Sequence, residues 1–303
     1  MKFLLWFGFF VAITISITGR PHENEYPIRT GDPRFYAYHT ARLASGEASE
    51  ISESANALMY ARTSRGVREL ITALKGDLRL LNSDVNRPVV KFYVAKALGK
   101  TNTDLAVKPL LDEWNLTSSK IQTYDSSKKR TLKDGYADSQ SVSSPFFFEK
   151  DDMPITLAGG EMLRSLGSLP LSNESEEALK QALAHPNFYV RGSAADGMKF
   201  SDNKKFLGSL NDALGKEKDD FAKLSILCAI VILNQDLDSK SFWEVTGFLK
   251  NDNPFIRIKT SETLGILKFR ISEEALTNAI LVENDERVLA QLKRDLKLVK
   301  SVD

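Results

Sequence analysis

Residues 253–265 read NPFIRIKTSETLG, and this stretch decides the fold because close variants of it recur. The variants are PNFYVRGSAADGM at 186–198 and RPVVKFYVAKALG at 87–99. When Ile256 is counted as position one, apolar residues gather at positions one, five and eight or nine, the spacing of one face of an α-helix. The stretch is therefore predicted to be a helix that is repeated along the chain.

The interval between copies supports a repeat. Position nine is occupied by Leu98, Leu166, Met198, Ile230, Leu264 and Leu296, at successive intervals of 68, 32, 32, 34 and 32 residues. Regular periods of this size are typical of repeat proteins, and the first interval is about twice the others. A second amphipathic run precedes each copy, at 67–81, 104–114, 174–184, 204–214, 240–249 and 273–282. Each unit is therefore predicted to consist of two helices.

The segments VKFYVAKALG, VRGSAADGMK and IRIKTSETLG resemble the second helices of HEAT-like repeats, over residues 65–300. The resemblance implies an all-α fold, a right-handed α-solenoid of about six to seven helix pairs whose second helices line the concave side. It also implies that a basic residue at position two bonds to acidic or amide groups in the turns between helices. This residue is Lys91, Arg191, Lys223 or Arg257 in four units, whereas Gly159 and Leu289 depart from the pattern. Arg257 is accordingly expected to be structural and not catalytic.

The regions outside the repeats have other signatures. Residues 1–19 place one lysine before a long apolar run, the layout of an export signal, with an uncleaved N-terminal membrane anchor as the alternative because the cleavage site is poor. Residues 20–32 read as a linker, and residues 33–64 as two helices that cap the first repeat. The segment at about 116–150 is rich in serine and mixed charge and is expected to be a flexible insertion that splits the second unit. Its aromatic run, Phe146 to Phe148, leaves open whether it is a solvated tether or a functional segment.

No catalytic constellation emerges from the sequence. The three histidines have no metal-ligand spacing, and the single cysteine excludes a cysteine-rich metal site, so no cofactor is expected. The formal net charge is +1, and the residues at position seven of the repeats are of mixed sign, which argues against nucleic acid as a partner. They are Lys96, Arg164, Asp196, Cys228, Glu262 and Arg294.

The sequence therefore predicts an exported, non-enzymatic scaffold or adaptor that binds a protein or peptide along the concave face. Apolar residues at position three, beside polar residues at position seven, are expected to form the partner-binding surface. These residues are Phe92, Lys96, Leu224, Cys228, Ile258 and Glu262. Two alternatives stay open: an enzyme or enzyme accessory with its functional residues in 116–150, and a membrane-tethered structural spacer.

Overall fold

The computed structural model describes residues 28, 30–76, 87–121, 153–235, 240–267 and 269–301. Every regular element in these ranges is helical, and they contain no strand, so the predicted all-α class is confirmed. The first seven α-helices are α1 (Phe35–Ser45), α2 (Ala48–Tyr60), α3 (Ser64–Lys75), α4 (Arg87–Leu98), α5 (Val107–Ser118), α6 (Met153–Ser168) and α7 (Asn173–Ala182). The others are α8 (Phe188–Phe200), α9 (Leu207–Leu214), α10 (Asp220–Asn234), α11 (Lys240–Gly247), α12 (Pro254–Leu267), α13 (Arg270–Val282) and α14 (Glu286–Lys300).

Several predicted segments fall outside the described residues. They are the export signal at 1–19, the linker at 20–32 apart from residues 28 and 30–32, and residues 122–150 of the insertion. Helix α5 ends at Ser118, so residues 116–118 of the insertion predicted at about 116–150 are helical. Helices α1 and α2 lie in the range 33–64, where two helices were predicted.

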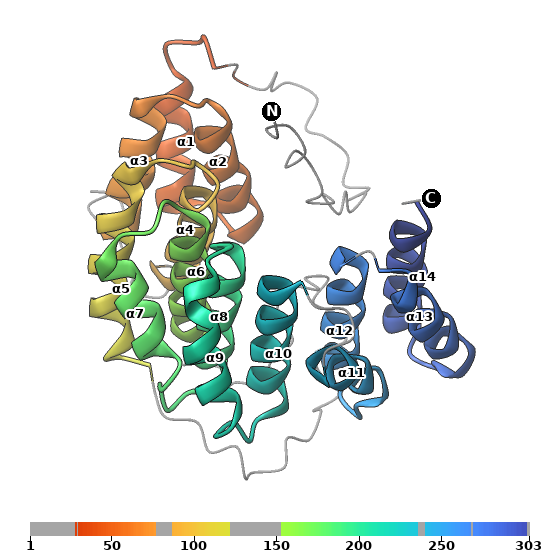
Figure 1. The fold of residues 1–303 in the computed structure, drawn as a ribbon. Helices are drawn as coiled ribbons and strands as arrows, with labels where there is room; N and C mark the ends of the chain where they lie inside the picture. The colour runs from red at the N-terminus through yellow and green to blue at the C-terminus, as the bar shows by residue number, and fades with distance from the viewer. Residues whose placement is uncertain are drawn as a thin grey trace, which may run out of the picture.

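The helices follow one another from one end of the molecule to the other (Figure 1). Helices α4, α6, α8 and α10 pack side by side in that order, α10 packs on α12, and α12 packs on α14. Each of these six helices also contacts the helix that precedes it in the chain. The six are the helices that contain the recurring stretch, and we call them the second helices.

The recurring stretch explains how the second helices pack. Positions one, five and nine are buried in all six of them, with the exception of Leu296, which is only partly buried. This outcome confirms the helical face predicted from the spacing. Successive residues of an α-helix are rotated by about 100°, so positions five and seven lie nearly opposite one another. Position seven therefore points away from the contacts that position five makes, and we call the surface that it marks the inner face.

A shared N-cap fixes where four of the second helices begin. The side chains of Asn187, Asp219, Asn253 and Asp285 each accept a hydrogen bond from the backbone N–H two residues further on, at distances of 2.9, 2.9, 3.0 and 2.9 Å. All four lie three residues before position one. Such a cap satisfies one of the N–H groups that a helix leaves without a partner, typically for about 1 kcal/mol.

The hydrophobic interior is divided at α10. One large cluster of buried apolar residues runs from Phe35 to Leu233, and a second runs from Leu224 to Val299. Helix α10 contributes to both, with Ile226 and Ile230 in the first cluster and Leu227 and Val231 in the second. This helix therefore joins the two parts of the molecule.

Glycines allow α6 and α8 to approach closely. A Cβ atom added to Gly167 would lie 1.9 Å from the carbonyl oxygen of Gly197, and one added to Gly160 would lie 2.5 Å from both Ser193 and Tyr189. A side chain at either position would force the helices apart. The Gly159–Gly160 pair is thus explained by helix packing.

Candidate functional site

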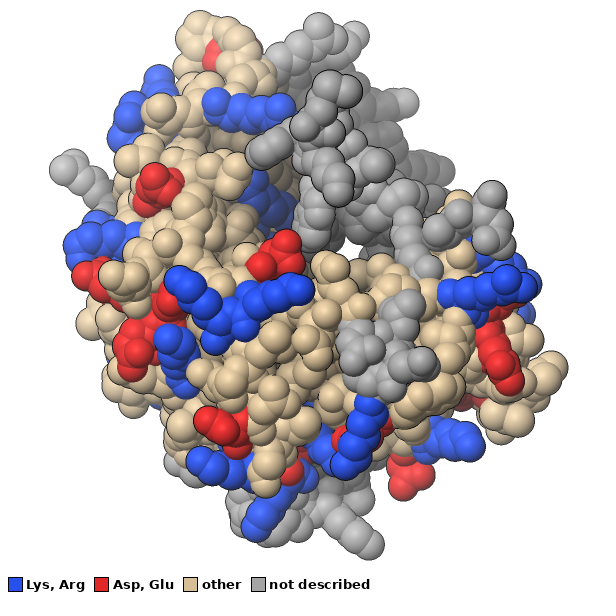
Figure 2. All heavy atoms as spheres, viewed as in Figure 1, with Lys and Arg blue, Asp and Glu red and all other residues tan. Residues whose placement is uncertain are grey.

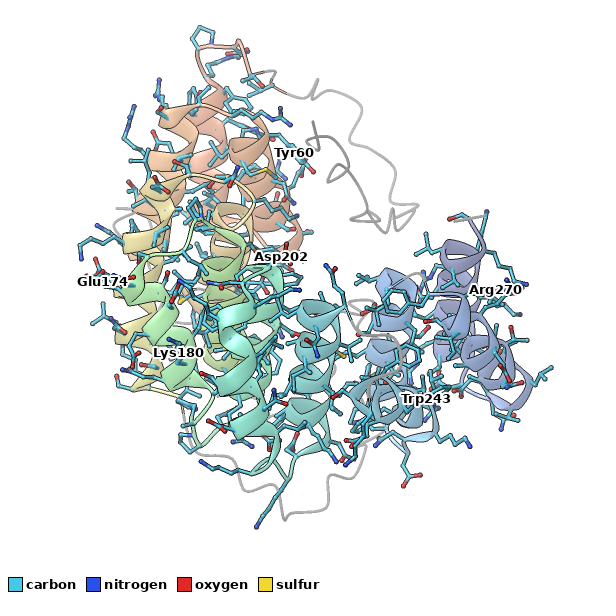
Figure 3. The ribbon with its side chains drawn as sticks, in the orientation of Figure 1. Tyr60, Glu174, Lys180, Asp202, Trp243 and Arg270 are labelled. Atoms are coloured by element: carbon cyan, nitrogen blue, oxygen red, sulfur yellow. The ribbon has the colours of Figure 1, made fainter. Side chains whose placement is uncertain are left out.

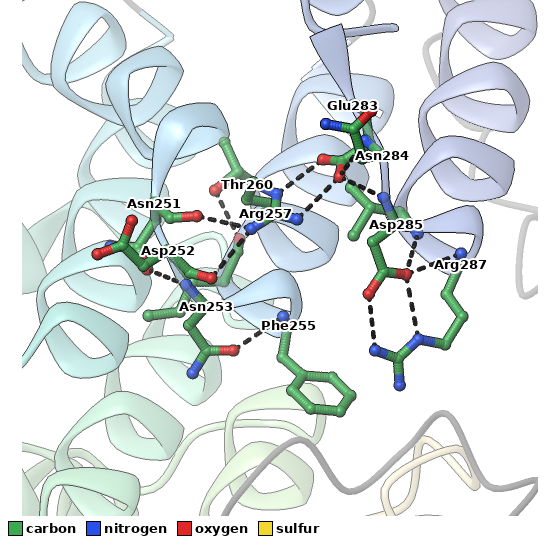
Figure 4. Close-up of polar contacts among 12 residues, drawn as sticks. Asn251, Asp252, Asn253, Phe255, Arg257, Thr260, Glu283, Asn284, Asp285 and Arg287 are labelled. Atoms are coloured by element: carbon green, nitrogen blue, oxygen red, sulfur yellow. Dashed lines mark hydrogen bonds and ion pairs between the residues drawn. The ribbon is translucent and has the colours of Figure 1, made fainter. Parts of the chain in front are cut away.

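Arg257 ties together two turns of the structure (Figure 4). Its guanidinium donates to the carbonyl oxygens of Asn251 and Asp252, at 2.8 and 3.1 Å, in the turn before α12. It also donates to both carboxylate oxygens of Glu283, at 2.7 and 2.8 Å, in the turn before α14. The hydrogen bond from Arg257 holds the pKa of Glu283 below its ordinary value, although partial burial opposes this.

Arg191 of α8 makes the same set of bonds as Arg257. It joins the turn before α8 to the turn before α10. It donates to the carbonyl oxygens of His185 and Pro186, at 2.9 and 3.0 Å, and to both oxygens of Glu217, at 2.6 and 2.7 Å. In both copies the glutamate lies 26 residues after the arginine and two residues before the N-cap aspartate of the next second helix. Each glutamate also accepts two backbone N–H groups of its own turn.

The other two basic residues at position two also meet carboxylates. Lys91 bonds to Glu113, and the ammonium of Lys223 lies 3.9 Å from Glu244. Glu113 lies within α5 and Glu244 within α11, so the predicted bonds to groups in the turns are found only for Arg191 and Arg257, whereas Lys91 and Lys223 pair with carboxylates of the following helix. Arg257 holds turns together, as expected, and its bonds leave no site for a ligand between it and Glu283.

The signal that identifies the glutamates was in the sequence but was not used. Glu217-Lys218-Asp219 and Glu283-Asn284-Asp285 share a Glu-x-Asp pattern at the same place before a second helix. The aspartate caps the helix and the glutamate receives the arginine.

The residues predicted to bind a partner are not all accessible. Phe92 and Lys96 are partly buried and Glu262 is exposed, but Leu224 and Cys228 are completely buried and only 7% of Ile258 is exposed. The expectation that Leu224, Ile258 and Cys228 face an open groove is therefore wrong in this structure. All three belong to the second hydrophobic cluster.

Position three is buried in α6, α8, α10 and α12 because it faces the next second helix. Two of its occupants show this directly, since Gly160 lies against Tyr189 and Ser193 of α8, and Gly192 lies against Phe221 of α10. Leu224 and Ile258 hold the same position in α10 and α12 and fill the space in front of the following helix. The helical period places position three beside position seven, but it does not reveal which neighbour covers it.

Position seven of α8 carries Asp196, the centre of a polar network. This residue of α8 is 3% exposed, and its carboxylate receives cations from three helices. Arg164 of α6 donates at 3.3 Å, Lys199 of α8 donates at 3.2 Å, and Lys259 of α12 donates at 2.8 and 3.1 Å. Burial opposes the ionisation of Asp196, but these cations outweigh it and hold the pKa of the carboxyl well below its usual range.

Further charged side chains extend the network along the inner face. Arg164 donates to the hydroxyl oxygen of Tyr189 at 2.9 Å and lies 3.5 Å from Glu161. Burial raises the pKa of Glu161, which is also within electrostatic reach of Lys96 in the last turn of α4 and of Lys100 just after that helix. Together with Glu262, which interacts with Lys199 and Lys259, these residues form what we call the inner-face charge cluster. Its members are Lys96, Lys100, Glu161, Arg164, Asp196, Lys199, Lys259 and Glu262.

Cys228 lies on α10, the helix that the Lys259 to Asp196 contact crosses. Its sulfur is fully buried and lies 3.2 Å from the hydroxyl oxygen of Thr263 on α12. Burial raises the pKa of the thiol, although Lys199 and Lys259 act in the opposite direction. A buried thiol with a raised pKa is a poor nucleophile, so Cys228 serves the packing between α10 and α12.

Outside the inner face, charged residues of both signs are interspersed. Figure 2 shows basic and acidic side chains mixed over one face of the molecule, without a large area of one sign. The large apolar side chains exposed there are scattered, such as Trp243 on α11 and Tyr60 at the end of α2, which are 52% and 69% exposed (Figure 3). Single exposed apolar residues are normal on soluble surfaces and do not by themselves mark a site.

The described residues offer no candidate metal site and no candidate membrane span. Within the described ranges, no group of three or more His, Cys, Asp and Glu side chains is arranged to hold a metal ion. None of the described helices combines the length and the apolar content needed to cross a membrane. No protein-family model matches the sequence, and no curated protein matches it.

Proposed function

We propose that the protein is an exported, non-enzymatic scaffold or adaptor that binds a protein or peptide along its inner face. In this proposal the helices form a right-handed α-solenoid of HEAT-like pairs, about six to seven in number, with the inner face as the concave side. The order of packing supports it, because each second helix contacts the next one and the helix before it. The apolar run after Lys2 supports export.

The observation that carries the binding role is the inner-face charge cluster. Positions one, five and nine already supply the apolar contacts of the second helices, so the charged residues at positions four, seven, ten and eleven are not required for that core. Removing charges from water is costly, and apolar residues in their place are often neutral or stabilising. A set of ionic side chains from four second helices on one surface is therefore better explained by recognition than by stability.

The accessible part of the surface differs from the one expected from sequence. Phe92, Lys96 and Glu262 keep exposed area, and Arg164 and Lys259 join them, with 18% and 20% of their side chains exposed. Leu224 and Cys228 take no part, since both are completely buried. The proposed contact surface thus extends over α4, α6 and α12.

Site-specific photo-crosslinking tests the proposal. A photoreactive amino acid at Lys96 or Glu262 should crosslink a discrete protein or peptide in the exported fraction of the native source. The same group at Lys108, which lies on α5 with 78% of its side chain exposed, is the control. Crosslinks that appear equally at Lys108, or at none of the three positions, would rule out binding on the inner face. A membrane-tethered spacer without a partner should give no crosslink at any of the three positions.

A further inference from the structure

Asp295 of α14 is a second buried carboxylate, and its surroundings differ from those of Asp196. Both residues are 3% exposed. The oxygens of Asp295 accept hydrogen bonds from the hydroxyl of Ser261 on α12, at 2.5 Å, and from the amide of Gln291 on α14, at 2.9 and 3.0 Å. These donors are neutral, and none of the described lysines or arginines forms an ion pair with this carboxylate. Asp196, in contrast, shares three cations.

Close packing of α14 on α12 keeps water away from Asp295. A Cβ atom added to Gly265 of α12 would lie 2.9 Å from the Cβ of Asp295 and 3.0 Å from its Oδ1. Glycine at this position therefore lets the carboxyl group lie against the backbone of α12. The group is part of the contact between the two helices and not of the solvent-exposed surface.

The charged residues of α12 do not neutralise Asp295. The two basic residues of this helix, Arg257 and Lys259, are bonded to other carboxylates. Its acidic residue, Glu262, is within electrostatic reach of Asp295, and each of these two negative charges disfavours the other.

Helices α13 and α14 provide no bonded cation for Asp295 either. Arg294 favours its ionisation from a distance, but this side chain is exposed and therefore screened by solvent. Glu273 of α13 is paired with Lys300 at 3.3 Å, and the other charged residues of the two helices are exposed. Burial is the largest influence on the carboxyl group and raises its pKa above the ordinary value, against the effect of its two neutral donors.

We propose that Asp295 is a pH-sensitive latch between α12 and α14, which holds the helix pair α13–α14 more tightly when the carboxyl group is protonated than when it is ionised. An ionised carboxylate is costly in these dry surroundings, whereas a protonated one is neutral and can donate a hydrogen bond to the oxygen of Ser261. No second helix follows α14 in the described part of the chain, so α12 is the second helix that holds it. This inference does not rest on the proposed function.

The latch should tighten on mild acidification. A group with a raised pKa, such as Asp295, contributes stability that is complete below the pKa of the unfolded chain and is lost as the pH rises through the folded value. Glu283 and Asp285, in the turn before α14, have lowered pKa values because each accepts hydrogen bonds from an arginine. They stay ionised to lower pH, so a change from neutral pH to about pH 5 should tighten α14 on α12 before it weakens that turn.

Hydrogen–deuterium exchange of the full chain tests the inference, because it reports the local opening of a helix. After correction for the intrinsic rate, the amides of α14 should exchange more slowly at about pH 5 than at about pH 7. Asp295→Asn should lose most of this difference, because it has no carboxyl group to titrate. The matched control is Asp112→Asn on α5, where 48% of the side chain is exposed, and it should keep the wild-type difference.

Ser261→Ala keeps the carboxyl group and decides the question even if Asp295→Asn does not fold. It removes a hydroxyl that favours the ionised form, so the pH at which α14 loses its protection should move to a higher value. A purely structural role of Ser261 would raise exchange at every pH without moving this midpoint. An unmoved or lowered midpoint, an equal pH dependence of α14 in wild type and Asp295→Asn, or faster exchange of wild-type α14 at the lower pH would each overturn the inference.

Discussion

Lys259 on α12 contacts Asp196 on α8, although 63 residues and the whole of α10 separate them. The ammonium nitrogen lies 3.1 and 2.8 Å from the two carboxylate oxygens. Helix α10 lies between these helices and belongs to both hydrophobic clusters. The contact therefore fastens the second cluster to the first across the helix that joins them.

Removing the carboxylate should destabilise the fold more than removing one of its cations. Asp196→Asn leaves Arg164, Lys199 and Lys259 without their shared anion, and the loss of a buried partner typically costs about 3–5 kcal/mol. Lys259→Met leaves Asp196 with two cations and keeps an apolar side chain over Phe221, so it should cost about 2 kcal/mol or less. Urea unfolding at neutral pH measures both.

The control for this comparison is an exposed ion pair on α5. Lys108 and Asp112 are 3.1 Å apart, with 78% and 48% of their side chains exposed, so Asp112→Asn should cost less than about 1 kcal/mol. A loss as large as that of Asp196→Asn would show that burial does not set the difference. A larger loss for Lys259→Met than for Asp196→Asn would contradict the shared-carboxylate interpretation.

The pairing of Arg257 with Glu283 should make stability depend on pH. The pKa of Glu283 is held below its ordinary value in the folded protein, because its carboxylate accepts hydrogen bonds from Arg257. A lowered pKa stabilises the fold at pH values above that of the unfolded carboxyl, and this contribution is lost as the pH falls through the folded value. Arg257→Met should therefore destabilise at neutral pH, and the difference from wild type should shrink below about pH 4.5.

Two further variants separate this effect from lost packing. Arg257→Lys should also destabilise, because lysine cannot reach two carbonyl groups and both carboxylate oxygens at once. Against a Glu283→Gln background, Arg257→Met should lose the part of its pH dependence that comes from the carboxylate. Unfolding curves in urea at several pH values measure these differences. A wild-type to Arg257→Met difference that grows on acidification would have the wrong sign.

The helices and their buried positions could be predicted from sequence because they depend on a local period. Ile256 and Leu264 share one face of α12 whatever lies around them. Leu224 was misplaced because its surroundings depend on how α10 packs on α12, which the period does not specify. The contact of Lys259 with Asp196 was also beyond prediction, since each residue alone looks like an ordinary charge on a helix.

Truncations on opposite sides of α12 should have very different effects. Ile256 and Leu264 are 5% and 0% exposed in the second hydrophobic cluster, so replacing either with alanine should cost about 2–5 kcal/mol. Glu262 is exposed on the inner face, and Glu262→Gln should cost about 0.5 kcal/mol or less. Denaturant melts of the three variants make the comparison, and equal losses would mean that the buried face of α12 is misassigned.

Cys228 gives a direct measure of how α10 is covered. Its thiol is completely buried and its pKa is raised by that burial, so iodoacetamide should label it slowly in the native protein and fully in denaturant.

Lys259→Met removes a nearby ammonium group, which by itself would raise the pKa of the thiol further and slow the reaction. If the contact of Lys259 with Asp196 holds α12 against α10, the variant should instead be labelled faster, and only increased access of the reagent can produce that sign. Lys180→Met should be labelled at the wild-type rate. Slower labelling of Lys259→Met would show that the ammonium acts on the thiol only through its charge, and that the contact does not keep α10 covered.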